Sequence, residues 1–187
     1  MATGQHAYYQ ALYRVACLVN SSLDLRHTLD ATVQSVAEAM HAKASSLRLL
    51  DAGGDRLELV SSYGLSDRYL RKGAVDVSAS RIDREALAGK MVAVGDVATD
   101  TRLQYPEELA QEGISSVLCA PLIRHDHPIG VMRVYTGEAH AFAGEEVEFL
   151  QALADISALA IENARMYEGL HRTYAQTMEA LWGSGRG

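Results

Sequence analysis

The chain has 187 residues, of which 48% are hydrophobic and 22% charged, and 24 Asp and Glu outnumber 17 Lys and Arg to give a net charge of −7. This length and composition fit one globular domain with an extension and exclude a disordered chain, while the acidic balance argues against nucleic-acid binding. The sequence has no apolar run long enough for a membrane span and no secretory signal at its start. Its two cysteines are too few for a disulfide scaffold, so we expect a cytoplasmic protein.

Two helices are expected at the start of the chain. Apolar residues recur at intervals of three and four over residues 8–19, which is the pattern of a helix with one buried face. Residues 20–22 interrupt this pattern, because their short polar side chains compete for backbone hydrogen bonds. A second helix is expected over residues 24–41, with Asp24 as its N-cap.

A hairpin is expected next, with strands at residues 46–51 and 57–62. Gly53 and Gly54 lie between them and adopt positive φ without steric cost, which is typical of a tight turn. Residues 63–77 carry glycines and mixed charges, and we expect them to be irregular.

A short helix is predicted to begin at Ser80. Ser80 and Asp83 have the spacing of a capping box, in which each side chain accepts a bond from the other's backbone N–H. Gly89 is suited to end this helix in the left-handed conformation. A third strand is expected over residues 91–97.

A further helix is predicted between Pro106 and Gly113, since proline is well tolerated in a first turn and glycine at a helix end. Strands are then expected at residues 116–123 and 129–135, on either side of a polar loop. Pro121 has no N–H to donate, so its end of the first strand should be an edge or a bulge.

Residues 145–182 contain one glycine and no proline, which predicts a single long helix. At 1.5 Å per residue it would be about 57 Å long. This exceeds the width of such a domain, so the last turns should leave it. Tyr167, Leu170, Tyr174 and Leu181 follow the spacing of a coiled-coil seam, although Thr177 makes the seam imperfect. We therefore expect a homodimer joined through residues 5–20 and 150–182.

Several segments together resemble the GAF domain family. In that family a glycine ending a helix, a small polar residue, a Pro-Leu pair and an Ile-Gly-Val strand recur in the order found at residues 113–122 and 129–134. The flanking matches are Leu23-Asp24-Leu25, Gly95-Asp96-Val97 and residues 160–165. The resemblance covers about residues 23–168.

The resemblance implies an α+β fold of profilin-like or PAS-like type. A central antiparallel sheet of five or six strands would carry the terminal helices on one face and short pocket helices on the other. The chain then divides into an N-terminal helix for packing and dimerisation (1–22), a GAF-like sensor domain (23–165) and a signalling helix with a flexible tail (166–187).

GAF domains are mostly regulatory modules that bind small molecules and signal through their terminal helices. The resemblance therefore implies a non-enzymatic sensor in bacterial-type signal transduction, with an unidentified ligand and an effector of kinase, cyclase or transcription-regulator type. Because only five residues follow Trp182, we expect the effector to be a separate chain or to lie on a part that has been removed.

The known GAF chemistries find little support in the sequence. The Asn-Lys pair of the phosphodiesterase signature is missing, because neither Asn20 nor Asn163 precedes a lysine, which leaves cyclic-nucleotide binding as a minor alternative. Cys17 and Cys119 do not lie where a covalent bilin attaches, and they are a poor match to the paired redox cysteines of GAF-type methionine-sulfoxide reductases. The cofactor is therefore unknown.

Histidine is the other residue type that binds metals and haem. His125 and His127 have a spacing that, on a strand, would direct both imidazoles to one side, as metal ligands require. They fall in the expected loop without a third ligand nearby, so a solvated turn is favoured over a metal site. A haem ligand would have to come from outside residues 42–124, which contain no histidine.

Seven polar residues are candidates to face a ligand in the implied pocket. They are Arg48, Tyr63, Ser80, Asp96, Arg102, Tyr105 and Ser115. We expect Arg102 to pair with an anionic group and Tyr105 to stack on a planar ring. The alternative is that Asp96 and Arg102 satisfy each other or the loop backbone. Two other functions stay open: a dimerisation module whose pocket is filled by side chains, and a small redox enzyme that uses Cys119.

Overall fold

A curled six-stranded antiparallel sheet forms the centre of the computed structural model, which describes residues 2–22 and 24–183. The strands lie in the order β3-β2-β1-β6-β5-β4. They are β1 (Ala44–Leu50), β2 (Arg56–Tyr63), β3 (Val75–Asp76), β4 (Val92–Val94), β5 (Ser116–Arg124) and β6 (His127–Thr136). The expected α+β fold with five or six antiparallel strands is confirmed.

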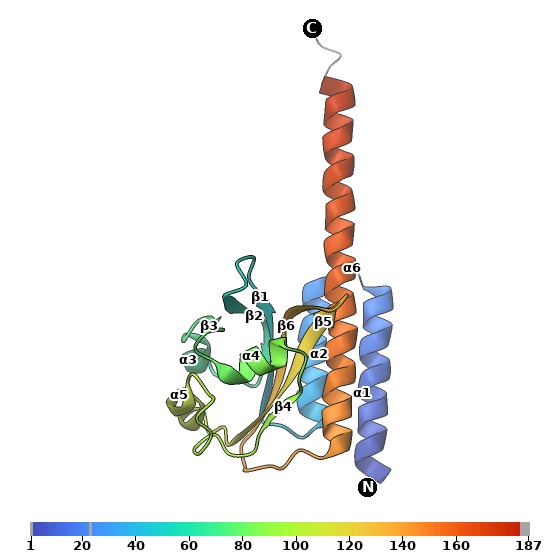
Figure 1. The fold of residues 1–187 in the computed structure, drawn as a ribbon. Coiled ribbons are helices and arrows are strands. Elements are labelled where there is room, and N and C mark those ends of the chain that lie inside the picture. The colour runs from blue at the N-terminus through green and yellow to red at the C-terminus, as the bar shows by residue number, and fades with distance from the viewer. Residues whose placement is uncertain (1, 23, 184–187) are drawn as a thin grey trace.

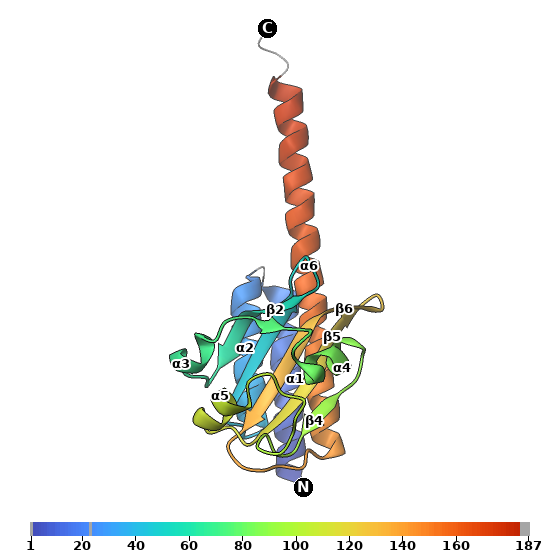
Figure 2. The same cartoon turned by 60° about the vertical axis from the view of Figure 1, so that its left-hand side comes forward.

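The helices divide between the two faces of this sheet (Figures 1 and 2). The long terminal helices α1 (Ala2–Ser21), α2 (Leu25–Ala39) and α6 (Gly144–Gly183) lie together on one face. The short helices α3 (Asp67–Leu70), α4 (Arg81–Leu87) and α5 (Pro106–Gln111) lie on the other. This division follows from the long apolar stripes of the terminal helices, which need an extended apolar surface to cover them.

Each face of the sheet has its own hydrophobic core, because successive side chains of a strand point to opposite faces. Leu47, Met132 and Val134 are fully buried against the terminal helices. On this side the Tyr8 ring stacks on Phe149 with 4.3 Å between ring centroids. The second core, under the short helices, contains Val131 and Tyr135 from β6.

Local sequence signals place most of the element ends. The Asp24 side chain accepts a hydrogen bond from the backbone N–H of His27 at 3.0 Å and so caps α2. Gly89 and Gly113 have φ of 88° and 67°, as their predicted helix-ending role requires. Pro121 lies beyond Cys119, where β4 stops pairing with β5, and a register shift follows at Leu122, so both parts of the expectation for Pro121 hold.

Other details differ from the sequence-based expectations. The capping box at Ser80 does not form: the Ser80 side chain makes no capping bond to the described residues, and Asp83 instead pairs with Arg133 in the core. A buried guanidinium without a counter-charge is costlier than an uncapped helix end, so Arg133 takes the carboxylate. The loop at residues 124–128 is tighter than expected, with His125 and Asp126 alone at positive φ between β5 and β6. Residues 63–77, expected to be irregular, contain α3 and β3.

Helix α6 is 40 residues long, and its C-terminal part projects away from the sheet and the other helices (Figure 1). Leu150 and Leu153 in its first half are buried, whereas Leu170 and Tyr174 in its second half are 71% and 66% exposed. The side chains of Leu181 and Trp182, together with Leu23 and residues 184–187, lie outside the described residues. No helix within residues 2–22 and 24–183 combines the length and apolarity that a membrane span needs.

Candidate functional site

The sheet face beneath the short helices carries an unusual group of charged side chains, three of them buried and one, Lys72, half-buried. Arg48 on β1, Arg133 on β6, Asp83 on α4 and Lys72 in the loop after α3 form what we call the basic cluster. Arg48 and Arg133 share this face because Ser46, two residues from Arg48, lies directly opposite Arg133 in the ladder. The cluster therefore follows from strand register, from helix α4 and from the loop after α3, which lie over the sheet.

Arg48 is 1% exposed, yet no carboxylate bonds to it among the described residues. One terminal nitrogen donates to the backbone carbonyls of Leu57 at 3.2 Å and Gly73 at 3.4 Å. Burial lowers the pKa of this guanidinium, and the nearby Arg133 acts in the same direction. An arginine side chain still keeps its charge near neutral pH, so Arg48 is a buried cation held by carbonyl groups alone.

Arg133 forms the one buried ion pair of the cluster. Its guanidinium donates to the fully buried carboxylate of Asp83. Burial opposes the charge of Arg133, but Asp83 and Tyr135 favour it, and together they hold its pKa above the ordinary value. Tyr135 is fixed in turn, because its hydroxyl hydrogen-bonds the Ser46 hydroxyl at 2.9 Å. The pair anchors α4 to the middle of the sheet.

Lys72 lies over the cluster from the α3–β3 loop. Its ammonium lies 4.8 Å from the ring centroid of Tyr69 and 4.3 Å from that of Tyr105. Burial, followed by the charges of Arg48 and Arg133, lowers the pKa of Lys72 to about 7. The side chain therefore gives up its proton at a much lower pH than an ordinary lysine.

Hydrogen bonding within the cluster is incomplete. Among the described residues, Arg48 Nε, Asp83 Oδ1 and Arg133 Nε are buried side-chain atoms without a partner. The cavity between Lys72, Tyr105 and Arg133 measures about 10 Å³, which is close to the space of one water molecule. The cluster thus combines unused donors with almost no free space.

The structure distributes the seven residues proposed from the sequence over several places. Arg48 belongs to the basic cluster, and Ser80 and Tyr105 line the small cavity beside it. Tyr63 is 40% exposed at the end of β2. Ser115 donates its hydroxyl to the carbonyl of Gly137 at 3.0 Å, away from the cavity.

Asp96 and Arg102 each have local partners. The Asp96 carboxylate accepts a hydrogen bond from the backbone N–H of Ala98 at 2.9 Å. Arg102 is bidentate to Asp100, and its third nitrogen bonds Glu85 at 3.2 Å. The hydrogen-bond donors of Arg102 thus bond neighbouring residues, so we leave Arg102 out of the site proposed below.

Sequence reasoning missed Lys72, Asp83 and Arg133 as site residues. Asp83 and Arg133 are 50 positions apart in the chain, and the spacing of neither residue indicates the pair. A usable signal was present nevertheless: Arg48 and Arg133 are lone charged residues within otherwise apolar strand segments. A charge inside such a segment is buried only when the fold supplies it with polar partners.

The cysteine and histidine candidates do not add a reactive group to the basic cluster. Burial raises the pKa of the Cys119 thiol to about 12, and Cys17 lies exposed on α1 across the sheet. His125 hydrogen-bonds Glu162 at 2.8 Å at the β5–β6 turn. Within residues 2–22 and 24–183 there is no grouping of His, Cys, Asp and Glu that would hold a metal ion.

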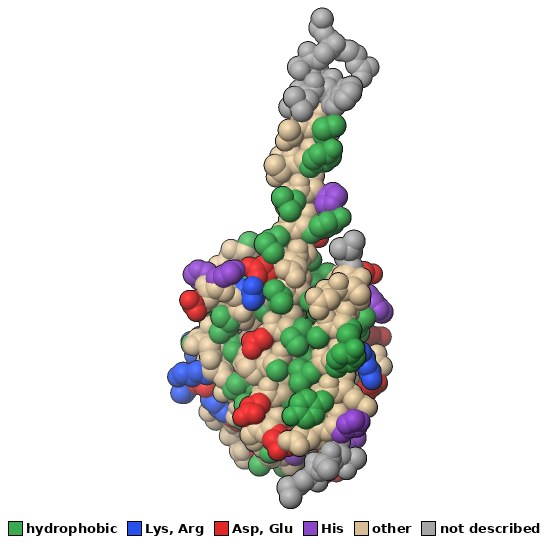
Figure 3. All heavy atoms as spheres, turned by 90° about the vertical axis from the view of Figure 1, so that its right-hand side faces the viewer, with side chains coloured by type: hydrophobic (Ala, Val, Ile, Leu, Met, Phe, Trp, Pro, Cys, Tyr) green, Lys and Arg blue, Asp and Glu red, His purple; other side chains and the backbone are tan. Residues whose placement is uncertain are grey.

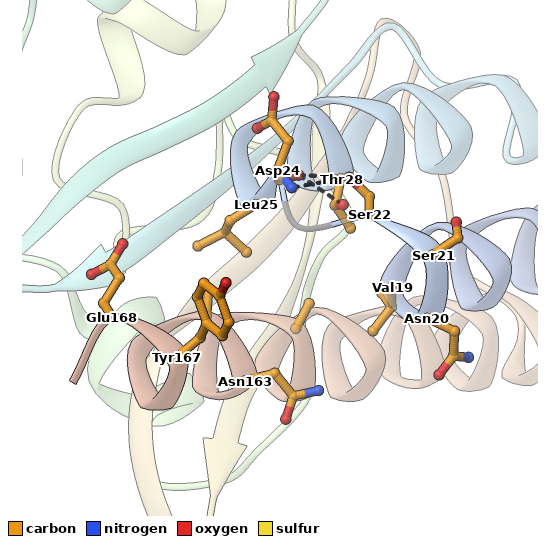
Figure 4. A pocket seen from close by; sticks show the side chains of 12 residues that line it. Val19, Asn20, Ser21, Ser22, Asp24, Leu25, Thr28, Asn163, Tyr167 and Glu168 are labelled. Atoms are coloured by element: carbon orange, nitrogen blue, oxygen red, sulfur yellow. Dashed lines mark hydrogen bonds between the residues drawn. The ribbon is translucent and has the colours of Figure 1, made fainter. Parts of the chain in front are cut away.

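A second hollow lies on the opposite side of the molecule, where the turn between α1 and α2 meets α6 (Figure 4). This groove has a volume of about 580 Å³. Tyr167 projects from α6 toward Leu25, and Asn20 and Asn163 lie along the same side (Figure 4). The groove contains no arginine or lysine, and it adjoins the point at which α6 leaves the domain.

Comparison with known proteins gives one consistent family. A family model described as GAF domain matches residues 22–162. The formate hydrogenlyase transcriptional activator of Salmonella typhimurium is 21% identical over 169 residues, which cover 86% of this chain. The chain spans about a quarter of the length of that relative (24%).

Solved structures support the same fold. The GAF domain of a phosphoenolpyruvate-protein phosphotransferase from Coxiella burnetii is 24% identical with a TM-score of 0.78, over 88% of this chain and 98% of that one. The free methionine-R-sulfoxide reductase from Neisseria meningitidis, in complex with its substrate, is 22% identical with a TM-score of 0.72, over 86% and 91%. At these identities the structures establish the architecture and not the activity.

Proposed function

The chain belongs to the GAF domain family, and from that premise we propose that it is a non-enzymatic regulatory sensor. In this proposal a small molecule binds on the sheet face under α3, α4 and α5, and the terminal helices carry the signal. The output would pass to an effector of kinase, cyclase or transcription-regulator type. The similarity to a transcriptional activator supports an output of the last kind.

The observation that carries the proposal is the incomplete hydrogen bonding of the basic cluster. A buried donor or acceptor without a partner costs about 1–3 kcal/mol, and more when it is charged. Arg48 Nε, Asp83 Oδ1 and Arg133 Nε are three such atoms in one place. A ligand that bonds to them would recover this energy, which is a physical reason for the free protein to tolerate the arrangement.

The strands that hold the cluster also contact the terminal helices. Arg48 alternates with Leu47, and Arg133 alternates with Met132, so each strand has one side chain in the cluster and the next in the core beneath α2 and α6. A ligand that shifts β1 against β6 would therefore move the surface on which α6 rests. We propose this as the route from the pocket to α6.

We also propose that the protein is a homodimer joined through residues 5–20 and 150–182. Large apolar side chains of α1 and α6 lie exposed on one side of the molecule (Figure 3). The exposed large apolar residues of these two helices are Tyr9, Tyr13, Leu159, Met166, Tyr167, Leu170 and Tyr174. Apolar patches of this kind are commonly covered by a second subunit, and closed two-fold pairing is the simplest arrangement. A second copy on this face would also cover part of the groove beside Tyr167.

Two other functions are less well supported. A module without any ligand would fit the cavity of about 10 Å³, but it gives no reason for three buried side-chain atoms without a hydrogen-bond partner among the described residues. A redox enzyme based on Cys119 would need a reactive thiolate, whereas this thiol is buried and its pKa is raised. Methionine-sulfoxide turnover that Cys119→Ser abolishes would support the enzyme, and turnover that persists would exclude Cys119 as its nucleophile.

Mass spectrometry of the purified chain tests ligand binding directly. We expect a small molecule that is present under native conditions and lost on denaturation, or a thermal shift with at least one member of a panel of cyclic nucleotides, nucleobases, amino acids and 2-oxo acids. A bound ligand at a hundredfold excess over Kd stabilises a folded protein by about 2.7 kcal/mol. The sensor proposal would be contradicted if no small molecule is retained and no probe shifts the melting temperature.

Light scattering tests the dimer. We expect a dimer at micromolar concentration for the full chain and a monomer after truncation at Arg165, because the truncation removes the exposed half of α6. A full-length monomer would refute the dimer, and a dimer that survives the truncation would place the interface elsewhere.

A further inference from the structure

We propose that the ligand of the basic cluster is a small oxyanion, carrying a carboxylate or a phosphate group, that bonds to Arg48 and Arg133 beneath Lys72. The inference rests on the proposed sensor function and adds the chemical class of the ligand. It is argued from the charge balance of the cluster, from its unused donors and from the position of Lys72.

The charge balance of the cluster favours an anion. Arg48, Arg133 and Lys72 share the site with a single buried carboxylate, that of Asp83. Glu108 on α5 is the other acidic group that acts on Lys72, and it is only partly buried. Like charges repel strongly where water is excluded, so protonation of Lys72 leaves a surplus of two positive charges in the cluster. A bound anion would remove most of this repulsion.

The unused hydrogen-bond donors are of the right kind. Arg48 Nε and Arg133 Nε are both buried and without a partner among the described residues. The N–H groups of a guanidinium match the oxygens of carboxylates and phosphates, and such charge-assisted bonds are stronger than neutral ones. One terminal nitrogen of Arg48 bonds Leu57 and Gly73, and one terminal nitrogen of Arg133 bonds Asp83, whereas both Nε–H groups are buried and free to bond a ligand.

The size of the cavity limits the ligand and gives Lys72 a role. About 10 Å³ is too little for an anion of several atoms, so binding requires Lys72 and Tyr105 to move outward. The residue after Lys72, Gly73, has φ of 84° in a region that costs glycine nothing, and its carbonyl accepts from Arg48. Lys72 would then return over the bound anion as a third cation.

The test uses the full chain and four probes: sodium formate, sodium acetate, inorganic phosphate and the neutral amide acetamide. Thermal shift and titration calorimetry at pH 7 are compared with sodium chloride at equal ionic strength. We expect formate, acetate or phosphate to raise the melting temperature above the chloride control, and acetamide to have no effect. A response to the two carboxylates alone, or to phosphate alone, would identify which oxyanion group the site binds.

Two arginine variants locate the effect. Arg48→Met removes the buried cation, and the matched control Arg56→Met removes an exposed arginine from the neighbouring strand β2. We expect Arg48→Met to weaken anion binding by about thirtyfold or more, which is the cost of losing a buried charged partner, and Arg56→Met to leave it unchanged. If circular dichroism shows Arg48→Met to be unfolded, Lys72→Met replaces it, with a loss of at least tenfold expected.

Three results would overturn the proposal. They are shifts with formate, acetate and phosphate that do not exceed the chloride control, an equal shift with acetamide, or unchanged anion binding in the folded arginine or lysine variant. A neutral small molecule retained by the purified protein, without any anion response, would refute the oxyanion and leave the sensor proposal standing. Failure of the sensor proposal itself would appear as no ligand of any kind.

Discussion

Replacing Lys72 by methionine should stabilise the protein in the absence of ligand. The lysine ammonium lies near two buried arginines, and methionine keeps an unbranched apolar chain between the rings of Tyr69 and Tyr105. Functional sites often contain residues that lower the stability of the fold but are needed for binding. If Lys72 instead served the fold, its removal would destabilise the protein.

The size of the effect follows from the pKa of Lys72. A fall from 10.5 to about 7 sets an upper limit of about 4–5 kcal/mol on the cost of its charge at neutral pH, at 1.36 kcal/mol per pH unit. Partial solvent exposure screens this cost, and the loss of two cation–π contacts subtracts about 1 kcal/mol. We expect a net gain of about 1–3 kcal/mol, or about 3–10 °C in melting temperature for a chain of this length.

The assay is urea unfolding at several pH values, with Lys90→Met as the control because Lys90 is exposed. Between pH 7 and 10.5 unfolded Lys72 is protonated and folded Lys72 is not, so wild-type stability rises with pH relative to the variant. The gain from Lys72→Met should therefore be largest below pH 7 and shrink toward pH 10.5. A variant no more stable than the wild type at pH 7, or a gain independent of pH, would refute the reasoning.

Three further predictions concern the same site and its frame. Asp83→Asn should lower the free energy of unfolding by about 3–5 kcal/mol, because it leaves the Arg133 cation buried without its partner; urea unfolding measures this, and a loss below 1 kcal/mol would contradict it. Gly130→Ala should destabilise the protein by more than about 3 kcal/mol or prevent folding, since a Cβ there would lie 2.2 Å from the carbonyl oxygen of Arg48; wild-type thermal stability would contradict this. Anion binding should weaken as the pH rises through 7 and should take up a proton near pH 8, because the anion favours protonated Lys72; calorimetry in buffers of different ionisation enthalpy measures this uptake, and no uptake would contradict it.

Much of the fold could be predicted because its signals are local. Asp24 caps α2 by accepting a bond from an N–H three residues later, Gly89 and Gly113 end helices through their own backbone conformation, and apolar periodicity identifies the terminal helices. The resemblance to a family implies the antiparallel sheet of five or six strands and the division of the helices between its faces, which no local pattern contains. The strand order comes from the structure alone. The capping box predicted from the Ser80–Asp83 spacing is wrong, because the Asp83 carboxylate pairs with Arg133 of β6, which a local motif does not indicate.

The site was only partly predictable for the same reason. Arg48 is a candidate from the sequence only as one of seven polar residues that could face the implied pocket, and Lys72 and Asp83 are ordinary polar residues in their own segments. Their importance arises from tertiary placement over the sheet. Arg102, a candidate from the sequence alone, bonds Asp100 and Glu85, and no local pattern places Glu85 of α4 beside it.

The most direct test of the oxyanion site is a nuclear magnetic resonance titration of the arginine Nε–H groups with sodium acetate. The side-chain signals of Arg48, Arg133 and Arg56 are assigned by their loss in the Arg→Met variants or in an Arg133→Lys variant. We predict that the signals of Arg48 and Arg133 move together along one binding curve while that of Arg56 stays in place. Signals of Arg48 and Arg133 that do not move, or that move no more than Arg56 at equal ionic strength, would contradict the account.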